Sequence, residues 1–316
     1  MEFSTKQNIV KALKQYMELH QLSQSDVSKK SGVRKEYINI ILKEDSNFMY
    51  DAGNKQGLIP VQHFHALAET CGFSIEKSYW QTQPTPQFVS VISNLKDSKE
   101  HGVTSVFFGE TGSGKTHSIG VFASKNPHDT YVITVGSSDN LGDLIDKIID
   151  QLKITTGKTK SAKLRDISKK MKELKAQGYK PQIIFDEAEY MKQPALCTMK
   201  ELYDNLQNYC SIVLVGTDQL RENLDKLRKR NKAGIPQFYR RIKFGIRVIP
   251  TIDRSFGLFL QGIDKKLVNF LQRNCDNYGE LHDCLVPALR ESDISGEPLT
   301  VQLVRKVLNI PDGMYE

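Results

Sequence analysis

Residues 109–116 are GETGSGKT, a spacing of glycine, lysine and threonine that is typical of loops that bind phosphates. Such a loop needs glycine where the backbone turns its N–H groups toward anionic oxygens, and the positive end of the following helix adds to that field. Lys115 supplies a mobile positive charge for the β- and γ-phosphates, and the Thr116 hydroxyl is the expected ligand of Mg²⁺. We therefore predict that ATP and Mg²⁺ bind here. The residues assigned to the nucleotide are Gly109, Glu110, Thr111, Gly112, Ser113, Gly114, Lys115, Thr116 and His117.

A second candidate group ends the apolar run IIFDE at residues 183–187. Asp186 would hold Mg²⁺ through its water shell, and Glu187 would orient and deprotonate the water that attacks the γ-phosphate. Two adjacent carboxylates at the end of a strand could instead cap a helix, but the upstream loop favours the catalytic interpretation. The loop and the acidic pair together predict an enzyme that hydrolyses ATP to ADP and phosphate.

Five short apolar runs, rich in β-forming residues, would position these groups. They lie at residues 104–109, 130–135, 181–186, 211–216 and 246–250. Helical segments separate them, which predicts an α/β fold with a five-stranded parallel sheet covered on both faces. We expect the fourth strand to lie beside the strand of the phosphate loop, so that Thr217 and Asp218 at its end come near the γ-phosphate. From about Asp253 the periodicity is only helical, which predicts a small helical domain.

The first 80 residues have the pattern of a separate helical unit. Residues 81–87, QTQPTPQ, are polar, contain two prolines and predict a linker. Before this linker, residues 22–43 contain a short helix that Gly32 ends and a second helix that begins near Val33. The predicted domains are residues 1–80 (helical), 81–87 (linker), 88–250 (nucleotide-binding core) and 251–316 (helical).

Charge is distributed unevenly along the chain. The formal net charge is +7, and the basic excess lies in two runs at residues 158–175 and 226–243. A single run of this kind is usually a solvated helix face or a flexible loop. Two such runs in one domain favour a polyanionic partner such as nucleic acid.

Composition argues against several other classes of protein. The five cysteines include no CxxC pair and their number is odd, so neither a disulfide scaffold nor a zinc site is favoured. The apolar runs are far shorter than the roughly 20 residues that cross a bilayer. Residues 1–17 lack the continuous apolar core of a secretory peptide. We expect a cytoplasmic protein with no membrane partner.

Residues 22–43 resemble the phage-repressor-like helix-turn-helix family in their Leu-Ser-Gln start, their small-residue turn and the apolar end of the second helix. Residues 60–73 are similar to the helix that follows in that family. The resemblance implies DNA binding, although a protein-docking module is the alternative because the net charge of residues 1–80 is only about +1. The residues that would face the major groove are Arg34, Lys35, Glu36 and Asn39.

With the acidic pair, the extra strand and the helical tail, residues 88–316 resemble the AAA+ ATPases. The resemblance implies that Thr217 is the polar sensor residue and that subunits assemble side by side. One subunit's arginine would then complete its neighbour's site, and Arg240 and Arg241 occupy the matching place. The lid of that family usually presents an arginine to the nucleotide where this chain has His282, so the resemblance implies that His282 contacts the nucleotide. The sensor is more often asparagine than threonine, which implies slow hydrolysis.

Within the AAA+ proteins the chain resembles the transposition ATPase group typified by the B protein of phage Mu, in its domain layout and in FYRRI at residues 238–242. Members of that group polymerise with ATP on duplex DNA with little sequence preference, recruit and stimulate a transposase, and lose DNA on hydrolysis. The resemblance therefore implies a transposition target selector and transposase activator, whose partners are duplex DNA, an integrase-type transposase and further copies of itself in a helical or ring oligomer. The implied DNA contacts are Lys158, Lys160, Lys163 and Arg165.

Two alternatives stay open at this point. A replicative helicase loader would share the ATPase core, prefer single-stranded DNA and bind a helicase. A nucleotide-gated transcription regulator would use the helix-turn-helix domain to recognise an operator, with ATP setting the oligomeric state.

Overall fold

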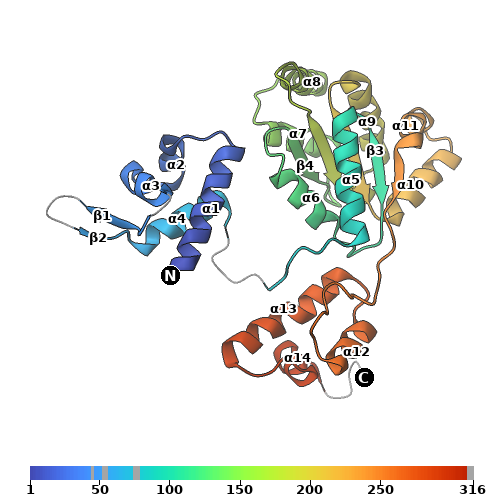
Figure 1. The fold of residues 1–316 in the computed structure, drawn as a ribbon. Helices are drawn as coiled ribbons and strands as arrows, with labels where there is room; N and C mark the ends of the chain where they lie inside the picture. The colour runs from blue at the N-terminus through green and yellow to red at the C-terminus, as the bar shows by residue number, and fades with distance from the viewer. Residues whose placement is uncertain (44–45, 52–55, 74–78, 312–316) are drawn as a thin grey trace. The chain divides into compact units, whose positions relative to one another are not determined.

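The computed structural model describes residues 1–43, 46–51, 56–73 and 79–311. The chain forms two units, residues 1–79 and residues 80–316 (Figure 1). Each unit has hydrophobic clusters of its own. Within the described ranges no helix combines the length and the apolar character that spanning a bilayer requires.

The described part of the first unit consists of four helices and a short hairpin. Its elements are α1 (Phe3–Leu19), α2 (Gln24–Ser31), α3 (Lys35–Leu42), β1 (Met49–Asp51), β2 (Gln56–Leu58) and α4 (Val61–Cys71). Ser23 and Asp26 cap the start of α2 reciprocally, and Gly32 ends the helix in the left-handed conformation that glycine adopts without steric cost. The helices agree with the all-helical prediction for this region. The antiparallel hairpin β1–β2 is a feature that the prediction did not include.

The second unit contains a parallel sheet of five strands in its described residues. The strands are β3 (Ser105–Phe108), β4 (Thr130–Thr134), β5 (Gln182–Asp186), β6 (Ser211–Gly216) and β7 (Ile246–Val248). Their order is β4-β5-β6-β3-β7, and every neighbouring pair is parallel. The predicted five-stranded parallel sheet is therefore confirmed, with β6 beside the strand that leads into the phosphate loop.

Two layers of helices cover the sheet, because successive strand residues face opposite sides. Phe107 of β3 packs in the cluster of α5 (Pro86–His101) and α6 (Lys115–Ser124), whereas its neighbours Val106 and Phe108 pack in the cluster of the other layer. Helix α5 crosses the face of the sheet in Figure 1. The other layer contains α7 (Leu141–Leu152), α8 (Lys160–Ala176), α9 (Gln193–Leu206), α10 (Asp218–Lys229) and α11 (Ile235–Ile242), and short 3₁₀ turns lie at η1 (Ala188–Tyr190) and η2 (Lys243–Gly245).

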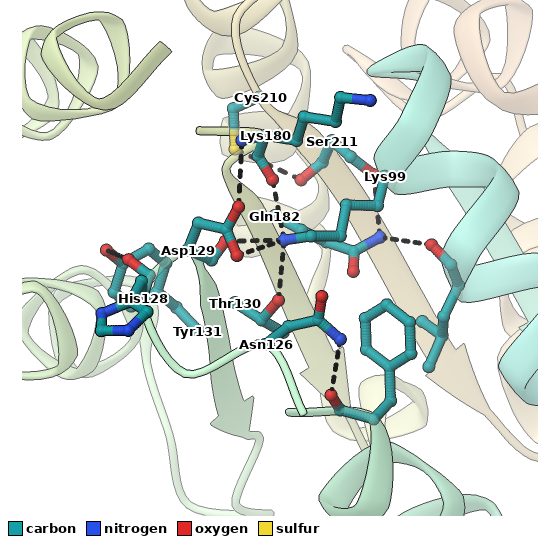
Figure 2. Close-up of polar contacts among 12 residues, drawn as sticks. Lys99, Asn126, His128, Asp129, Thr130, Tyr131, Lys180, Gln182, Cys210 and Ser211 are labelled. Carbon is teal, nitrogen blue, oxygen red and sulfur yellow. Dashed lines mark hydrogen bonds and ion pairs between the residues drawn. The ribbon is translucent and has the colours of Figure 1, made fainter. Parts of the chain in front are cut away.

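At the amino end of the sheet, Lys99 of α5 joins the starts of two strands (Figure 2). Its ammonium donates to Asp129 Oδ1 at 2.6 Å, to Thr130 Oγ1 at 3.0 Å and to the backbone carbonyl of Lys180 at 2.8 Å. The side chains of Lys99 and Asp129 are only 10% and 14% exposed. Burial lowers the pKa of Lys99, and the hydrogen bond to Asp129 opposes that shift. The network fixes α5 to β4 and β5 at the end of the sheet away from the phosphate loop.

A helical lid follows β7 and consists of α12 (Lys265–Asn274), α13 (Tyr278–Ser295) and α14 (Val301–Leu308). The Tyr278 hydroxyl donates to Gln87 Oε1 at 2.9 Å, and the Tyr278 N–H donates to the carbonyl of Gly112 at 3.1 Å. The start of α13 is thereby fastened both to α5 and to the phosphate loop. Helix α5 begins at Pro86, inside the predicted linker, with the Thr85 hydroxyl as its N-terminal cap.

Candidate nucleotide-binding site

The predicted phosphate loop leaves the carboxyl end of β3 and enters α6. The Gly109 N–H donates to the carbonyl of Gly216 at 3.2 Å, which ties the start of the loop to β6. Gly112 and Gly114 have φ angles of 72° and 80°, in the left-handed region that favours glycine. A side chain at Gly112 is also excluded sterically, because a Cβ there would lie 2.3 Å from the side chain of Asn277. The loop therefore has the backbone and the following helix terminus that anion binding requires.

Lys115, the first residue of α6, places its ammonium within the loop. Nζ donates to the carbonyls of Gly109 at 2.9 Å and Glu110 at 2.6 Å. Burial lowers the pKa of this ammonium, while the carboxylates of Glu189 and Asp186 oppose the shift. A cation in such low-dielectric surroundings attracts phosphate oxygens more strongly than one in water.

Thr116 of α6 and Asp186 at the end of β5 come together. The Thr116 hydroxyl donates to Asp186 Oδ2 at 2.7 Å, and the Asp186 side chain is buried. Burial raises the pKa of this carboxyl, and the hydrogen bonds from Thr116 and from the Glu187 N–H oppose that effect. A hydroxyl and a carboxylate are the hard oxygen ligands that Mg²⁺ prefers, so these residues fit the predicted ion.

Glu187 follows with an exposed side chain and a left-handed backbone at φ 56°. For a non-glycine residue this conformation costs about 1–3 kcal/mol. Its N–H donates to Asp186 Oδ1 at 3.0 Å, which helps to hold the turn. A cavity of about 430 Å³ opens here, and its lining includes Lys115, Thr116, Asp186, Glu187, Glu189 and Thr217.

Thr217 lies at the carboxyl end of β6, where it precedes α10. Its Oγ1 is buried and has no hydrogen-bond partner among the described residues, and the same holds for Ser113 Oγ in the loop. The Thr217 N–H donates to Glu189 Oε2 at 3.3 Å. Glu189 was not predicted as a site residue, although it stands only two residues after Glu187 in the acidic run DEAE.

A second cavity, of about 360 Å³, lies on the other side of the loop and is lined by aromatic side chains. Trp80 stacks on Phe259 with ring centroids 4.5 Å apart and an interplanar angle of 15°. The edge of the His282 ring approaches Trp80 at 5.2 Å, and Thr82 Oγ1 bonds His117 Nε2 at 2.8 Å. Flat apolar faces beside a phosphate loop suit a purine base. Sequence reasoning assigned both histidines to the nucleotide but missed the aromatic residues.

Comparisons with known proteins agree with this geometry. Residues 99–224 match the family model described as AAA domain. Residues 99–224 therefore lie in a domain with the P-loop AAA+ fold. No curated protein matches this sequence.

Several solved structures are similar to this chain over about three quarters of its length. The ORC2 protein of Aeropyrum pernix, in ADPNP-ADP complexes, is 15% identical over 74% of this chain and 70% of its own, with a TM-score of 0.52. Cdc6p of Pyrobaculum aerophilum is 14% identical over 75% and 71%, with a TM-score of 0.54. The Aeropyrum pernix ORC1 protein in complex with DNA is 14% identical over 71% and 64%, with a TM-score of 0.50. At these identities the likeness shows the fold alone.

The two predicted arginines of the AAA+ domain differ in their surroundings. Arg241 donates to Asp204 Oδ1 through Nε at 2.7 Å and through a terminal nitrogen at 2.6 Å, and its guanidinium lies over the Tyr203 ring. Arg240 is exposed. Neither residue lines the two cavities beside the loop. Arg241 is thus engaged within its own subunit, whereas Arg240 is free to reach outward.

The predicted DNA contacts also separate into engaged and exposed residues. Lys160 lies 3.8 Å from Glu201, and Lys163 forms an ion pair with an aspartate of α7. Lys158 and Arg165 are exposed. In the first unit, the predicted groove-facing residues on or just before α3 are all exposed, namely Arg34, Lys35, Glu36 and Asn39.

Proposed function

We propose that this protein is an ATP-dependent, largely sequence-nonspecific duplex-DNA-binding ATPase that assembles on DNA in the cytoplasm, selects transposition targets and activates a transposase. The observation that carries the ATPase part is the convergence of the Lys115 ammonium, the Thr116–Asp186 pair and Glu187 at one edge of the sheet. The domain layout and the FYRRI run carry the resemblance to transposition ATPases. The fold likeness to the ORC1 protein that was solved in complex with DNA supports a DNA-directed role.

In the proposed reaction each residue has one task. Lys115 leaves the loop carbonyls to bind the β- and γ-phosphates, and Thr116 and Asp186 hold Mg²⁺. When bound, Mg²⁺ supplies positive charge that offsets the charge of the phosphates. Glu187 accepts the proton of the attacking water. The Thr217 hydroxyl, which is buried and unpartnered among the described residues, is available to orient that water or the γ-phosphate.

The outer edge of the sheet supports self-association. The Phe244 side chain is 82% exposed and Val248 of the edge strand β7 is 64% exposed. Arg240, in the last turn of α11, is exposed, and the Lys243 ammonium lies over the Phe244 ring. An exposed aromatic residue with basic neighbours fits the acidic rim of a second copy's nucleotide site, where Arg240 would complete that site.

Exposed basic residues on α8 support binding to the DNA backbone. Arg165, Lys169 and Lys172 are exposed and lie three or four positions apart, so they share one face of the helix. The last two were not in the predicted set of contacts. Contacts of this kind bind phosphates without reading bases, which gives affinity that falls steeply with salt.

A trapped ATP state tests this function directly. Glu187→Gln keeps the residues that bind nucleotide and removes the proposed base, so ATP-dependent complexes with duplex DNA should outlive those of the wild type. Complex lifetime is measured by filter binding with labelled duplex and an excess of unlabelled competitor. The matched control is Glu222→Gln, which changes a carboxylate of the same cavity that has no assigned role. Complexes that form equally well without nucleotide would refute the switch.

A second candidate function is replicative initiation or helicase loading, which the fold likeness to ORC and Cdc6 proteins favours. Competition between duplex and single-stranded DNA separates it from the first, because a helicase loader should prefer the single strand.

A third candidate, a nucleotide-gated regulator, is favoured by the exposed face of α3. It predicts that Asn39→Ala abolishes binding to one particular duplex sequence while leaving nonspecific binding intact.

A further inference from the structure

The lid contains a pair of thiols that the proposed function does not use. Cys275 follows the last residue of α12 and is buried, and Cys284 lies in the second turn of α13 and is half-buried. A hydrogen bond between the two thiols shifts their pKa values in opposite directions, which places the two sulfurs next to each other. Both line one open cavity of about 540 Å³. The pair is therefore close together and can be reached by a small reagent.

The chain between the two cysteines contacts the nucleotide site. Tyr278, Gly279 and His282 all line the aromatic cavity beside the phosphate loop. Just before them, the Asn277 side chain lies against Gly112, and the Tyr278 N–H donates to the Gly112 carbonyl. A covalent bond between the cysteines would close a ring around this segment.

We propose that Cys275 and Cys284 form a reversible disulfide in response to a hydroperoxide, and that this bond weakens nucleotide binding. The second part rests on the proposed function, in which the aromatic cavity takes the base of ATP. In the first step the Cys284 thiolate attacks the terminal oxygen of the hydroperoxide, the O–O bond breaks, and the other oxygen takes up a proton and leaves as an alcohol, or as water when the oxidant is hydrogen peroxide. The sulfur is then a sulfenic acid. In the second step the Cys275 sulfur attacks it, the S–O bond breaks, and the Cys275 proton leaves with the hydroxyl as water.

The surroundings of the cysteines favour this order of attack. The hydrogen bond from Cys275 lowers the pKa of Cys284, which increases its thiolate fraction, and the same bond raises the pKa of Cys275. The negative charges of Glu280 and Asp276 also raise the pKa of Cys275. Cys210 provides an internal contrast, because its complete burial raises its pKa to about 12. We therefore assign the first attack to Cys284 and expect Cys210 to be inert.

The disulfide would move the start of α13. An S–S bond of about 2.05 Å is shorter than any contact between two hydrogen-bonded thiols. Closing it draws Cys284 toward Cys275, and the intervening turn must shift against Gly112 and the aromatic cavity. We expect affinity for ADP to fall roughly threefold or more, which corresponds to a small change in binding free energy.

Mass spectrometry tests the bond independently of any nucleotide. The full chain is treated with hydrogen peroxide, alkylated and digested with trypsin. Residues 274–290 then form one peptide that contains both cysteines, because no lysine or arginine lies between Arg273 and Arg290. The expected result is a peptide that escapes alkylation, weighs two hydrogen atoms less than the reduced form, and returns to normal with dithiothreitol. Sulfinic acid at Cys284 without this linked form would overturn the proposal.

Titration with ADP, followed by the fluorescence of Trp80, tests the consequence. Trp80 is the single tryptophan of the chain and lines the aromatic cavity. Peroxide should weaken ADP binding in the wild type and in the control Cys71→Ser, and should have no effect in Cys284→Ser or in Cys275→Ala, which avoids a buried hydroxyl. A linked peptide with unchanged ADP affinity would overturn the switch alone. Reduced protein that fails to bind ADP would overturn the proposed function together with the switch.

Discussion

One partly buried lysine lies near each end of the sheet, and the two lysines are held differently. At the amino end, the Lys99 ammonium bonds the carboxylate of Asp129, a hydroxyl and backbone carbonyls of two strand starts (Figure 2). At the carboxyl end, the Lys115 ammonium bonds two carbonyls of its own loop, and its carboxylate neighbours act over longer distances. Burial lowers the pKa of both lysines.

Under the proposed function, this difference separates a structural cation from one that binds phosphates. A buried charge with a directly bonded counter-ion joins elements together, and removing either partner leaves the other buried without compensation. A buried charge that is held by loop carbonyls can exchange them for phosphate oxygens without breaking any link between strands. The strained backbone of Glu187 and the unpartnered hydroxyl of Thr217 lie at the same end as Lys115. Such features cluster at functional sites.

Of the variants that test this comparison, Lys115→Ala should have the largest effect. We expect ATP hydrolysis to fall by about a thousandfold, because the transition state loses a preorganised charge. The thermal midpoint should stay the same or rise, since a buried cation with no direct counter-ion is removed. A coupled assay of phosphate release and thermal unfolding measure the two effects. A protein that unfolds more readily would show that Lys115 is structural as well.

Exchanging Lys99 for methionine should produce the opposite pattern. Asp129 would stay buried without its cation, and we expect the free energy of unfolding to fall by about 3 kcal/mol. Affinity for ADP, measured by Trp80 fluorescence, should be unchanged. Lys180→Met is the matched control, because its exposed ion pair with Glu100 at the same end of the sheet is screened by water. Urea unfolding that gives the two variants equal stability would remove the distinction between the two ends.

The sequence predicted one end of the sheet far better than the other. The apolar runs located the strands, and the glycine spacing, Lys115 and Asp186 located the loop after β3 and the strand end that contacts it. These signals are local, because a loop that binds phosphates must carry its residue types at a fixed spacing. Lys99 and Asp129 are 30 residues apart, and neither has a local pattern that predicts their contact.

The aromatic cavity was missed for the same physical reason. Trp80, Phe259 and Tyr278 come from three distant segments and meet only because the lid packs beside α5. Hydrophobic periodicity predicts that such residues are buried but not which residues they meet. The hairpin β1–β2 has strands of only three residues, too short for a period-two pattern to be recognised.

The Thr217 hydroxyl tests the carboxyl end of the sheet further. It is buried without a partner among the described residues, which lowers stability, and it is proposed to orient water or the γ-phosphate. Thr217→Val keeps the shape of the side chain and removes the buried oxygen. We expect hydrolysis to fall about tenfold, while the free energy of unfolding rises by up to about 1 kcal/mol because an unpaired polar group is lost. Turnover and urea unfolding are measured on the same preparations. A variant that loses stability would mean that the hydroxyl has a partner, such as a bound water, in the nucleotide-free protein.

The smallest expected effect concerns Asp186, whose burial should change how the free energy of unfolding depends on pH. Burial raises the pKa of this carboxyl above its ordinary 3.8. Between 3.8 and its folded-state pKa, the folded protein therefore binds more protons than the unfolded chain, and stability must fall as the pH rises through this window. Asp186→Asn lacks this contribution. The difference in free energy of unfolding, wild type minus variant, should therefore decrease as the pH rises from below 3.8. Urea unfolding across this range, without nucleotide or Mg²⁺, measures the difference. A relative stability that increases with pH would mean that Thr116 and Lys115 favour the carboxylate more than burial disfavours it, and the carboxyl end of the sheet would then resemble the compensated pair at the amino end.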